Sequence, residues 1–497
     1  MQKIIDLVHA TRVYEVASES PLSVAHQLSV RSKNTIYLKR EDKQVVHSFK
    51  LRGAYQKISG LSAKQKAKGV VASSAGNHAQ GVALSASKLG IESVIVMPLS
   101  TPKIKVNAVE QLGGKVVLHG DVYDDAFAYA KQLEQQQDLV FIHPYDDIEV
   151  IAGQATIAKE LLEQNPKMDR VFIPVGGGGL IAGMATYIKH YAPNIQVIGV
   201  EPKDSPTLYQ ALKNAERVIL PEVGRFADGV AVKQIGEVTY RIAKEVVDEV
   251  VLVSNDEICA AIKDIYEDVR SIAEPAGALA TAGLKKYIKQ NNIAGENLVA
   301  IVSGANVNFD RLRYIAERAD LGEHNEAIIA ATIDEKPGSF LKFCQLLDNH
   351  TITEFNYRYT PSNQARIFVG VALSKGLDEK QVLIDKLSQS FDVLDMSNNS
   401  IAKTHIRYMV GGRADAGNEV LYRFEFPERP GALLDFLKKI GSDWNISLFH
   451  YRNHGADFGR VLIGLQVDDV SSIECRFDEL GYFYQNETDN KAYQYFL

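Results

Sequence analysis

Cysteine is scarce in this sequence. Its 497 residues include only three cysteines, Cys259, Cys344 and Cys475. An odd number of widely spaced cysteines favours neither a disulfide framework nor a zinc cluster. We therefore interpret all three as buried apolar residues and expect no metal site.

Long hydrophobic runs and an excess of positive charge are also missing. No run of about eighteen apolar residues occurs, which excludes a membrane-spanning helix. Residues 1–6 lack the cationic start and apolar core of a signal peptide. A net charge of -7 gives no general attraction to nucleic acid or anionic lipid. We expect a soluble cytoplasmic protein that binds neither nucleic acid nor membrane.

The chain is long enough for two or more domains, and its first part predicts an α/β domain. Short, continuously apolar runs alternate there with helical patterns. Such runs are typical of parallel strands that are covered by helices on both faces. The runs are residues 69–72, 93–97, 115–118, 139–142, 170–174 and 196–200, and the rhythm continues less regularly to 298–302.

The second part of the chain repeats itself. Residues 335–341 match 428–434, and residues 352–358 match 446–452. The offsets of 93 and 94 residues indicate a duplicated module, which a third match of 367–371 with 461–465 supports. The pattern of each copy predicts a ferredoxin-like βαββαβ order of strands and helices, with a Pro-Gly turn after the first strand. We place the domain boundaries after residues 322 and 410, where the segment 411–417 separates the copies.

One lysine, Lys50, lies between a strand pattern at residues 35–39 and a helical pattern that begins near Leu51. Partial desolvation by Phe49 would lower its pKa and make the amine a better nucleophile toward carbonyls. Taken alone, a solvated lysine in a helix's first turn is the commoner situation. Two further strand-to-helix turns, at residues 73–78 and 176–179, favour a functional role for Lys50 instead. Together the three turns fit a lysine site for an aldehyde cofactor, with a phosphate cradle and a substrate loop.

Four consecutive glycines follow the run at 170–174. They are Gly176, Gly177, Gly178 and Gly179, and Leu180 comes next. Backbone N–H groups without side chains at a helix start bind phosphate, whereas a tight helix-strand turn needs only one or two glycines. The run is neither a Walker loop nor a dinucleotide fingerprint, because the residues that complete those motifs are missing.

The turn at residues 74–78 also follows a strand. The small residues Ser74, Ala75 and Gly76 expose groups suited to a carboxylate, and the amide of Asn77 can donate to a ring oxygen. The alternative is that Ser74 or Asn77 is a plain N-cap. We interpret His78 as a helix-start histidine rather than a base. Ser303 is either a turn residue or a neutral partner for a ring nitrogen.

These motifs resemble a known family. Residues 48–53, 74–78, 176–180 and 303–306 are similar to the tryptophan-synthase-β type of pyridoxal-phosphate enzymes, specifically the serine/threonine dehydratases. The duplicated tail resembles the pair of ACT-like modules that ends biosynthetic threonine dehydratase. The resemblance implies a fold type II catalytic domain at residues 1–322 and two ACT-like modules at 323–410 and 411–497.

The resemblance also implies residue roles. Lys50 would hold pyridoxal 5'-phosphate as a Schiff base and act as the base, and Phe49 would lie against the ring. Asn77 would bond the ring hydroxyl and Ser303 the ring nitrogen. Substrate carboxylate would be held by Ser74, Ala75 and Gly76, and phosphate by Gly176, Gly177, Gly178, Gly179 and Leu180.

The implied reaction turns L-threonine into 2-oxobutanoate and ammonia, the first committed step of isoleucine biosynthesis, with L-serine as a possible second substrate. Family members of this shape are usually tetramers that isoleucine inhibits and valine relieves. For the effector pocket we select five residues near the matched segments, although each could equally be module core. They are Phe340, Phe355, Leu433, Leu434 and Phe449.

Other interpretations remain. On the same fold, serine dehydration, serine racemisation or threonine synthesis is the nearest enzymatic alternative. A non-catalytic amino-acid sensor would have no need of Lys50. The tail could also serve oligomerisation alone, and isoleucine titration separates that from sensing.

Overall fold

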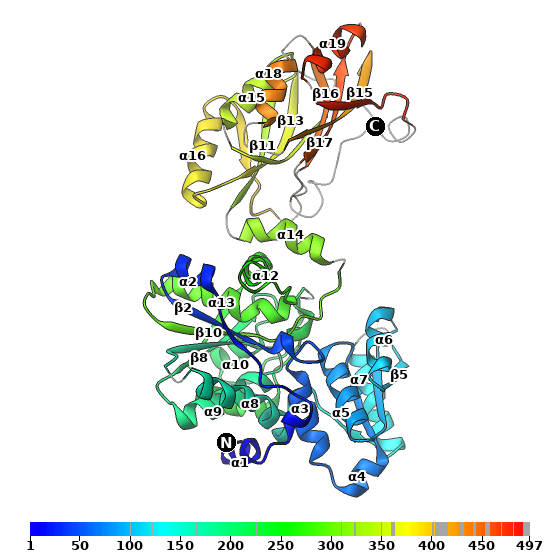
Figure 1. The fold of residues 1–497 in the computed structure, drawn as a ribbon, viewed down its shortest axis with the longest axis vertical. Helices are drawn as coiled ribbons and strands as arrows, with labels where there is room; N and C mark the ends of the chain where they lie inside the picture. Colours follow the sequence, from blue (N-terminus) through cyan, green and yellow to red (C-terminus); the bar gives the residue numbers. More distant parts are fainter. Residues whose placement is uncertain are drawn as a thin grey trace. The chain divides into compact units, whose positions relative to one another are not determined.

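The computed structural model describes residues 1–99, 101–120, 123–165, 167–224, 226–309, 311–322, 325–348, 350–358, 363–399, 402, 416–427, 432–440, 444–452, 458–468, 470–480 and 482–490. The chain divides into two compact units, Met1–Ala319 and Asp320–Leu497 (Figure 1). Most of the proposed separator, residues 411–415, and the second Pro-Gly turn, residues 430–431, lie outside the described residues.

The first unit contains two parallel sheets. One has the strand order β1-β2-β10-β7-β8-β9, in which only the β1–β2 pair is antiparallel, and the other has the order β5-β4-β3-β6. All six apolar runs are strands, as predicted, but their order in the chain does not reveal that they divide between two sheets. The larger sheet consists of β1 (Leu22–Val24), β2 (Thr35–Arg40), β10 (Asn297–Val302), β7 (Arg170–Pro174), β8 (Gln196–Pro202) and β9 (Glu249–Val253); the smaller consists of β5 (Lys115–Leu118), β4 (Ser93–Met97), β3 (Val70–Ser73) and β6 (Val140–Phe141).

Helices cover both faces of the larger sheet. Val171 and Ile173 of β7 face one apolar core, and Phe172 between them faces the other. The prediction that helices cover both faces of the strands is therefore confirmed for the central strands. It fails for β5, where Lys115 and Leu118 are exposed because β5 is an edge strand. One core is built by α1 (Gln2–His9), α8 (Ile148–Gln164), α9 (Gly179–Tyr191), α10 (Thr207–Asn214) and α11 (Glu237–Val246); the other by α2 (His26–Ser32), α12 (Asn255–Val269), α13 (Pro275–Asn291) and α14 (Arg311–Gly322).

The smaller sheet also has helices on two faces. Ala54 and Ile58 of α3 pack into one core with α5 and α6, and Ala126 and Ala130 of α7 pack into the other. The helix α3 thus connects the two sheets, because the loop before it leaves β2 of the larger sheet. The bounds are α3 (Lys50–Ser59), α4 (Ala63–Lys68), α5 (Asn77–Lys88), α6 (Lys103–Gln111) and α7 (Tyr123–Gln136).

The second unit confirms the duplicated βαββαβ order. The first copy contains β11 (Glu326–Asp334), α15 (Ser339–Leu347), β12 (Ile352–Arg358), β13 (Gln364–Ala372), α16 (Leu377–Ser388) and β14 (Asp392–Asp395). The second contains β15 (Glu419–Pro427), α18 (Ala432–Ile440), β16 (Asn445–Arg452), β17 (Phe458–Gln466), α19 (Val470–Leu480) and β18 (Phe483–Asn486).

The two copies share one sheet and one core. Strands β12 and β16 pair antiparallel, which produces an eight-stranded sheet. Asn356 lies opposite His450, its repeat equivalent, so a local two-fold axis passes between them. Side chains from both copies form one continuous apolar core. The copies are therefore folded as one body rather than as two separate modules.

The cysteine prediction needs one correction. Cys259 and Cys344 are buried as expected, but Cys475 is exposed. Ile473 and Phe477 occupy the inward face of α19, and Cys475 lies between them on the outward face. In the described parts of the chain, no helix is long and apolar enough to cross a membrane.

Candidate active site

Three of the predicted motifs meet at one sheet edge. Strands β2, β10 and β7 are adjacent and parallel, so their carboxyl ends lie at the same edge. Lys50 follows β2, Ser303 follows β10, and the glycine run follows β7. This edge is where open α/β sheets place their ligands.

The backbone fixes Lys50 beside Ser303. The N–H of Phe49 donates to the carbonyl of Ser303 at 3.2 Å, and the N–H of Ala305 donates to the carbonyl of His47 at 2.9 Å. The loop before α3 is thus paired with the loop after β10. This pairing holds the amine of Lys50 and the hydroxyl of Ser303 in one region.

A cavity of about 440 Å³, part of it open to solvent, lies at this edge. It gathers all the predicted cofactor residues, whereas Ser74, Ala75 and Gly76 are not among its lining residues. These three still lie next to the cavity in the chain, since they precede Asn77. Its lining consists of Phe49, Lys50, Asn77, Tyr145, Pro174, Gly176, Gly177, Gly178, Gly179, Leu180, Gly229, Val230, Glu274, Ala276 and Ser303.

Lys50 has the environment that the sequence predicted. Its Nζ lies 5.2 Å from the ring centroid of Phe49 and donates to the carbonyl of Pro144 at 3.3 Å. Burial lowers the pKa of Lys50 to about 8, and the charge of Glu274 opposes that effect. Near neutral pH the amine is therefore more easily deprotonated than an exposed lysine, as a nucleophile or base requires.

Two carbonyls of the glycine run bind to neighbouring residues, and this fixes the direction of the two N–H groups that follow them. The carbonyl of Gly176 accepts a hydrogen bond from Thr207 Oγ1 at 3.1 Å. The carbonyl of Gly177 accepts from Thr239 Oγ1 at 2.7 Å and from the N–H of Gly236 at 3.2 Å. In a trans peptide the N–H points opposite to the C=O, so the next two N–H groups face away from these partners. They precede the N-terminus of α9, which favours an anion.

We expect Gly177→Ala to weaken cofactor binding about 10-fold to 100-fold. An added Cβ would lie only 2.3 Å from the ring of Tyr145, and overpacking of this kind typically costs about 1–3 kcal/mol. Equilibrium dialysis with pyridoxal phosphate measures the effect. Gly60→Ala is the matched control, because its nearest neighbour would be 3.4 Å away. If the Gly177 variant bound pyridoxal phosphate as tightly as wild type, the glycine run would not be part of the cofactor site.

The N-cap alternative for Ser74 and Asn77 is wrong. Helix α5 has Gly76 as its N-cap and no side-chain cap, and Ser74 Oγ accepts from the N–H of Gly76 at 3.2 Å. Asn77 instead lines the cavity. His78 is buried, its Nε2 lies 2.9 Å from the carbonyl of Ile142, and burial lowers its pKa to about 3. It is a helix-start histidine, as expected, and burial keeps its ring neutral near pH 7.

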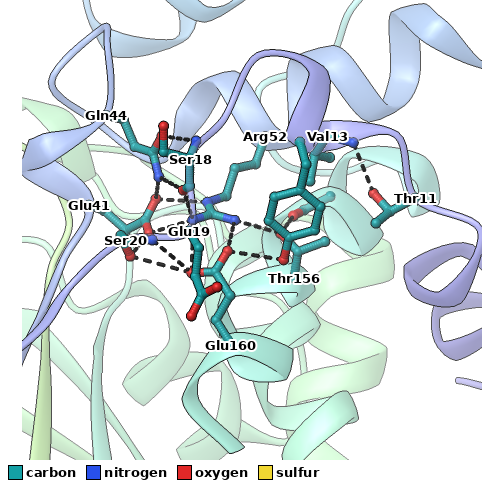
Figure 2. Close-up of polar contacts among 12 residues, drawn as sticks. Thr11, Val13, Ser18, Glu19, Ser20, Glu41, Gln44, Arg52, Thr156 and Glu160 are labelled. Atoms are coloured by element: carbon teal, nitrogen blue, oxygen red, sulfur yellow. Dashed lines mark hydrogen bonds and ion pairs between the residues drawn. The ribbon is translucent and has the colours of Figure 1, made fainter. Parts of the chain in front are cut away.

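A buried ion network anchors the helix that carries Lys50 (Figure 2). Arg52 is fully buried and donates to Glu41 at 2.8 Å and to Glu160 at 2.6 Å. Lys39 donates to the same Glu160 at 2.6 Å. Two cations thus balance two carboxylates. The network ties the first turn of α3 to the end of β2 and to α8, so it holds the backbone of Lys50 in place.

Sequence reasoning missed six of the residues that line the cavity, and only two of these, Glu274 and Tyr145, have polar side chains. Glu274 directly precedes the first residue of α13, Pro275, and such a position gives no signal beyond an acidic helix start. Burial, with the charge of Asp228, raises the pKa of Glu274 to about 7. Tyr145 lies in an irregular loop after β6 and contacts Gly177 and Gly179. Neither residue belongs to a recognisable local motif.

The donor set of the cavity fits pyridoxal phosphate. Lys50 offers an amine for the aldehyde, and the glycine run offers N–H groups for the phosphate. Asn77 and the buried hydroxyl of Ser303, which donates weakly to the carbonyl of Ala276 at 3.3 Å, offer neutral partners for the ring. Among the described residues, no group of three or more His, Cys, Asp or Glu side chains is placed to hold a metal ion.

Comparison with known proteins agrees with this geometry. Residues 14–304 match the family described as pyridoxal-phosphate dependent enzyme, and residues 317–406 and 410–497 match the C-terminal regulatory domain of threonine dehydratase. The chain is 56% identical to the biosynthetic L-threonine dehydratase IlvA of Pasteurella multocida, over 99% of this chain and 96% of that protein.

Solved structures are similar to about two thirds of this chain. The processed form of threonine deaminase isoform 2 from Solanum lycopersicum is 50% identical, with a TM-score of 0.64, over 64% of this chain and 88% of that one. Maize serine racemase is 31% identical, with a TM-score of 0.59, over 65% and 98%. The chain therefore belongs to the biosynthetic threonine dehydratase family, pyridoxal-phosphate dependent enzymes that carry a C-terminal regulatory domain.

Proposed function

We propose that this chain converts L-threonine into 2-oxobutanoate and ammonia, the first committed step of isoleucine biosynthesis, and that its second unit makes the rate respond to isoleucine and valine. The observation that carries the proposal is the cavity in which the low-pKa Lys50 meets the glycine run, Asn77 and Ser303. The regulatory domain favours a biosynthetic enzyme, because a degradative one has no reason to sense an end product.

The chain's residues have separate tasks at this site. Bound pyridoxal phosphate supplies an electron sink that stabilises negative charge at the substrate Cα. Lys50 would hold the cofactor through its amine nitrogen, and in its neutral form this amine would accept the substrate's Cα proton. Phe49 would pack against the ring, and Ser303 would offer its neutral hydroxyl to the ring nitrogen. Ser74, Ala75 and Gly76 hold the substrate carboxylate.

A parallel substrate assay tests the reaction. Purified protein with pyridoxal phosphate receives L-threonine or L-serine, and 2-oxo acid, ammonia and D-amino acid are all measured. We expect 2-oxobutanoate from threonine, a smaller rate of pyruvate from serine, and little D-serine. A dominant D-serine product would instead support the racemase alternative, which the likeness to maize serine racemase keeps relevant.

A second pocket, which is open to solvent, supports effector binding to the regulatory unit. It lies where the two copies meet, between the turn before α15 and the start of β16. Phe340 lines this pocket, but the other effector candidates do not. Phe355 and Phe449 are fully buried and Leu433 nearly so, all within the shared core, while Leu434 packs on it half-buried. The lining includes Ile333, Glu335, Lys336, Phe340, Leu341, Tyr357, Leu437, Trp444, Asn445 and Ile446.

One group in this pocket suits an amino-acid effector. Glu335 Oε1 accepts from the hydroxyl of Tyr357 at 2.5 Å and from Asn445 Nδ2 at 3.4 Å. Its Oε2 is buried and has no hydrogen-bond partner among the described residues. A buried carboxylate oxygen without a partner costs free energy that an ammonium group would recover. We assign the effector's ammonium to Glu335 and its aliphatic chain to Phe340 and Trp444.

We expect Glu335→Gln to raise the isoleucine concentration for half-inhibition at least about tenfold, since a hydrogen bond to a charged group contributes about 1.5–3 kcal/mol. The rate without effector should stay unchanged. Glu474→Gln is the matched control, because Glu474 also accepts from a tyrosine hydroxyl, that of Tyr422, but does not line the pocket. If isoleucine has no effect even on wild type, the second unit serves oligomerisation alone.

The cellular setting completes the proposal. We place the enzyme in the cytoplasm as a homotetramer, with L-serine as its second substrate. Size-exclusion chromatography with light scattering measures the assembly with and without isoleucine. Any coupling must be reciprocal, so isoleucine should bind more tightly to the state with low affinity for threonine.

A further inference from the structure

Glu274 lines the cofactor cavity but has no part in the roles assigned above. It precedes α13, its backbone N–H donates to the carbonyl of Gly304 at 3.1 Å, and its side chain is 6% exposed. A Cβ on Gly304 would lie 2.5 Å from Glu274 Oε1, so the glycine leaves room for the carboxylate. Burying a carboxylate costs free energy unless hydrogen bonds or opposite charges compensate for the lost water. The partners of Glu274 therefore indicate what it does.

The hydrogen-bond chain that reaches Glu274 has a fixed direction. Asn306 Nδ2 lies 2.8 Å from the carbonyl oxygen of Val46, which can only accept. The same Nδ2 therefore donates to Asn77 Oδ1, at 2.7 Å. This turns the amide nitrogen of Asn77 toward Glu274, and Nδ2 donates to Oε1 at 2.6 Å. The orientation of the Asn77 amide thus follows from a backbone carbonyl at one end and a carboxylate at the other.

This direction determines what Asn77 offers to a ligand. Its oxygen is engaged by Asn306, and one of its two N–H groups is engaged by Glu274. The second N–H is the group left for the cavity. Asn77 therefore presents a donor, which suits an oxygen that accepts, such as the ring oxygen of pyridoxal phosphate.

In its ionised form, Glu274 also places a negative charge near Lys50. Its charge raises the pKa of Lys50 against the effect of burial. The other charged groups that act on Glu274 are Asp228 and Lys105. The charge of Lys50 acts in turn on His78 and His143, but burial lowers their pKa values to about 3 and 4, so both are neutral near pH 7. The carboxylate is therefore the acidic group that favours a protonated nitrogen on Lys50.

We propose that Glu274 is a positioning residue, which directs the Asn77 N–H toward the cofactor and maintains the proton on the Lys50 nitrogen when that nitrogen holds the cofactor. The inference rests on the assignment of Lys50 as the cofactor lysine. Glu274 would make two contributions, one as a hydrogen-bond acceptor and one through its negative charge. Two different substitutions can separate these contributions.

The test compares Glu274→Gln with Glu274→Ala in the full-length protein. Glutamine keeps an acceptor oxygen for Asn77 but removes the charge, whereas alanine removes both. Two readouts need no substrate. One is the affinity for pyridoxal phosphate by equilibrium dialysis, and the other is the pH midpoint of the visible absorbance of the bound cofactor. Asp264→Asn is the control, because Asp264 is buried between Arg31 and Lys285 and does not line the cavity.

We expect Glu274→Gln to bind the cofactor within about threefold of wild type and to lower the absorbance midpoint by about one pH unit or more, the usual effect of losing a nearby opposite charge. Glu274→Ala should show the same shift and bind about tenfold more weakly. The Asp264 control should leave the midpoint unchanged. An unshifted midpoint in Glu274→Gln, or full affinity in Glu274→Ala, would overturn the proposal. A wild type without a visible band would instead reject Lys50 as the cofactor lysine.

Discussion

Lys50→Ala should lower threonine turnover by at least about three orders of magnitude. The variant loses both the amine that holds the cofactor and the base that takes the Cα proton, and general base catalysis alone typically contributes about 10²–10⁴-fold. The visible absorbance of bound cofactor should disappear as well. Initial rates of 2-oxobutanoate formation and an absorbance spectrum of the dialysed protein measure the two effects.

Another lysine of the same helix provides the control. Lys57 lies seven residues further along α3 and pairs with Asp147 at 2.7 Å, outside the cavity. Lys57→Ala should keep both the rate and the spectrum. If Lys50→Ala retained a tenth of the wild-type rate, another group would have to hold the cofactor, and the assignment of Lys50 would be wrong.

Arg52→Met should destabilise the first unit by about 3–5 kcal/mol, since removing one partner of a buried ion pair leaves uncompensated charge. The variant leaves Glu41 and Glu160 buried with only Lys39 as a cation. The first turn of α3 should loosen with it, so cofactor affinity should fall together with the thermal midpoint. Thermal unfolding followed by circular dichroism, with and without pyridoxal phosphate, measures both consequences.

Two comparisons show whether burial of charge is the cause. Arg12 makes an exposed ion pair with Glu15 at 2.6 Å, and Arg12→Ala should leave the thermal midpoint unchanged. Adding Glu41→Gln and Glu160→Gln to Arg52→Met should recover part of the loss, because the uncompensated charges are then removed. An Arg52→Met protein as stable as wild type would contradict an anchoring role for the network.

The sequence predicted those features that depend on local pattern. Continuous apolar runs identified the parallel strands, since a strand covered on both faces has no polar side. The four glycines identified a helix start free of side chains, and Lys50 was recognisable only together with the turns at residues 73–78 and 176–179. The repeat offsets predicted two βαββαβ copies, because each copy preserves its own hydrophobic pattern.

Features that depend on long-range packing could not be predicted in this way. The direct pairing of β12 with β16 joins the copies into one sheet, and no local pattern specifies it. This pairing also buries Phe355 and Phe449, which we had selected as effector residues. Glu274 reaches the cavity from a helix start nearly two hundred residues after Asn77. Its role follows only from the three-dimensional hydrogen-bond chain.

The most direct test of the account is the initial rate of 2-oxobutanoate formation across a range of L-threonine concentrations, with pyridoxal phosphate present, with and without isoleucine. We predict turnover of threonine, and isoleucine should shift the saturation curve to higher threonine concentrations. A protein that binds the cofactor but does not form 2-oxobutanoate from threonine would contradict the proposed function.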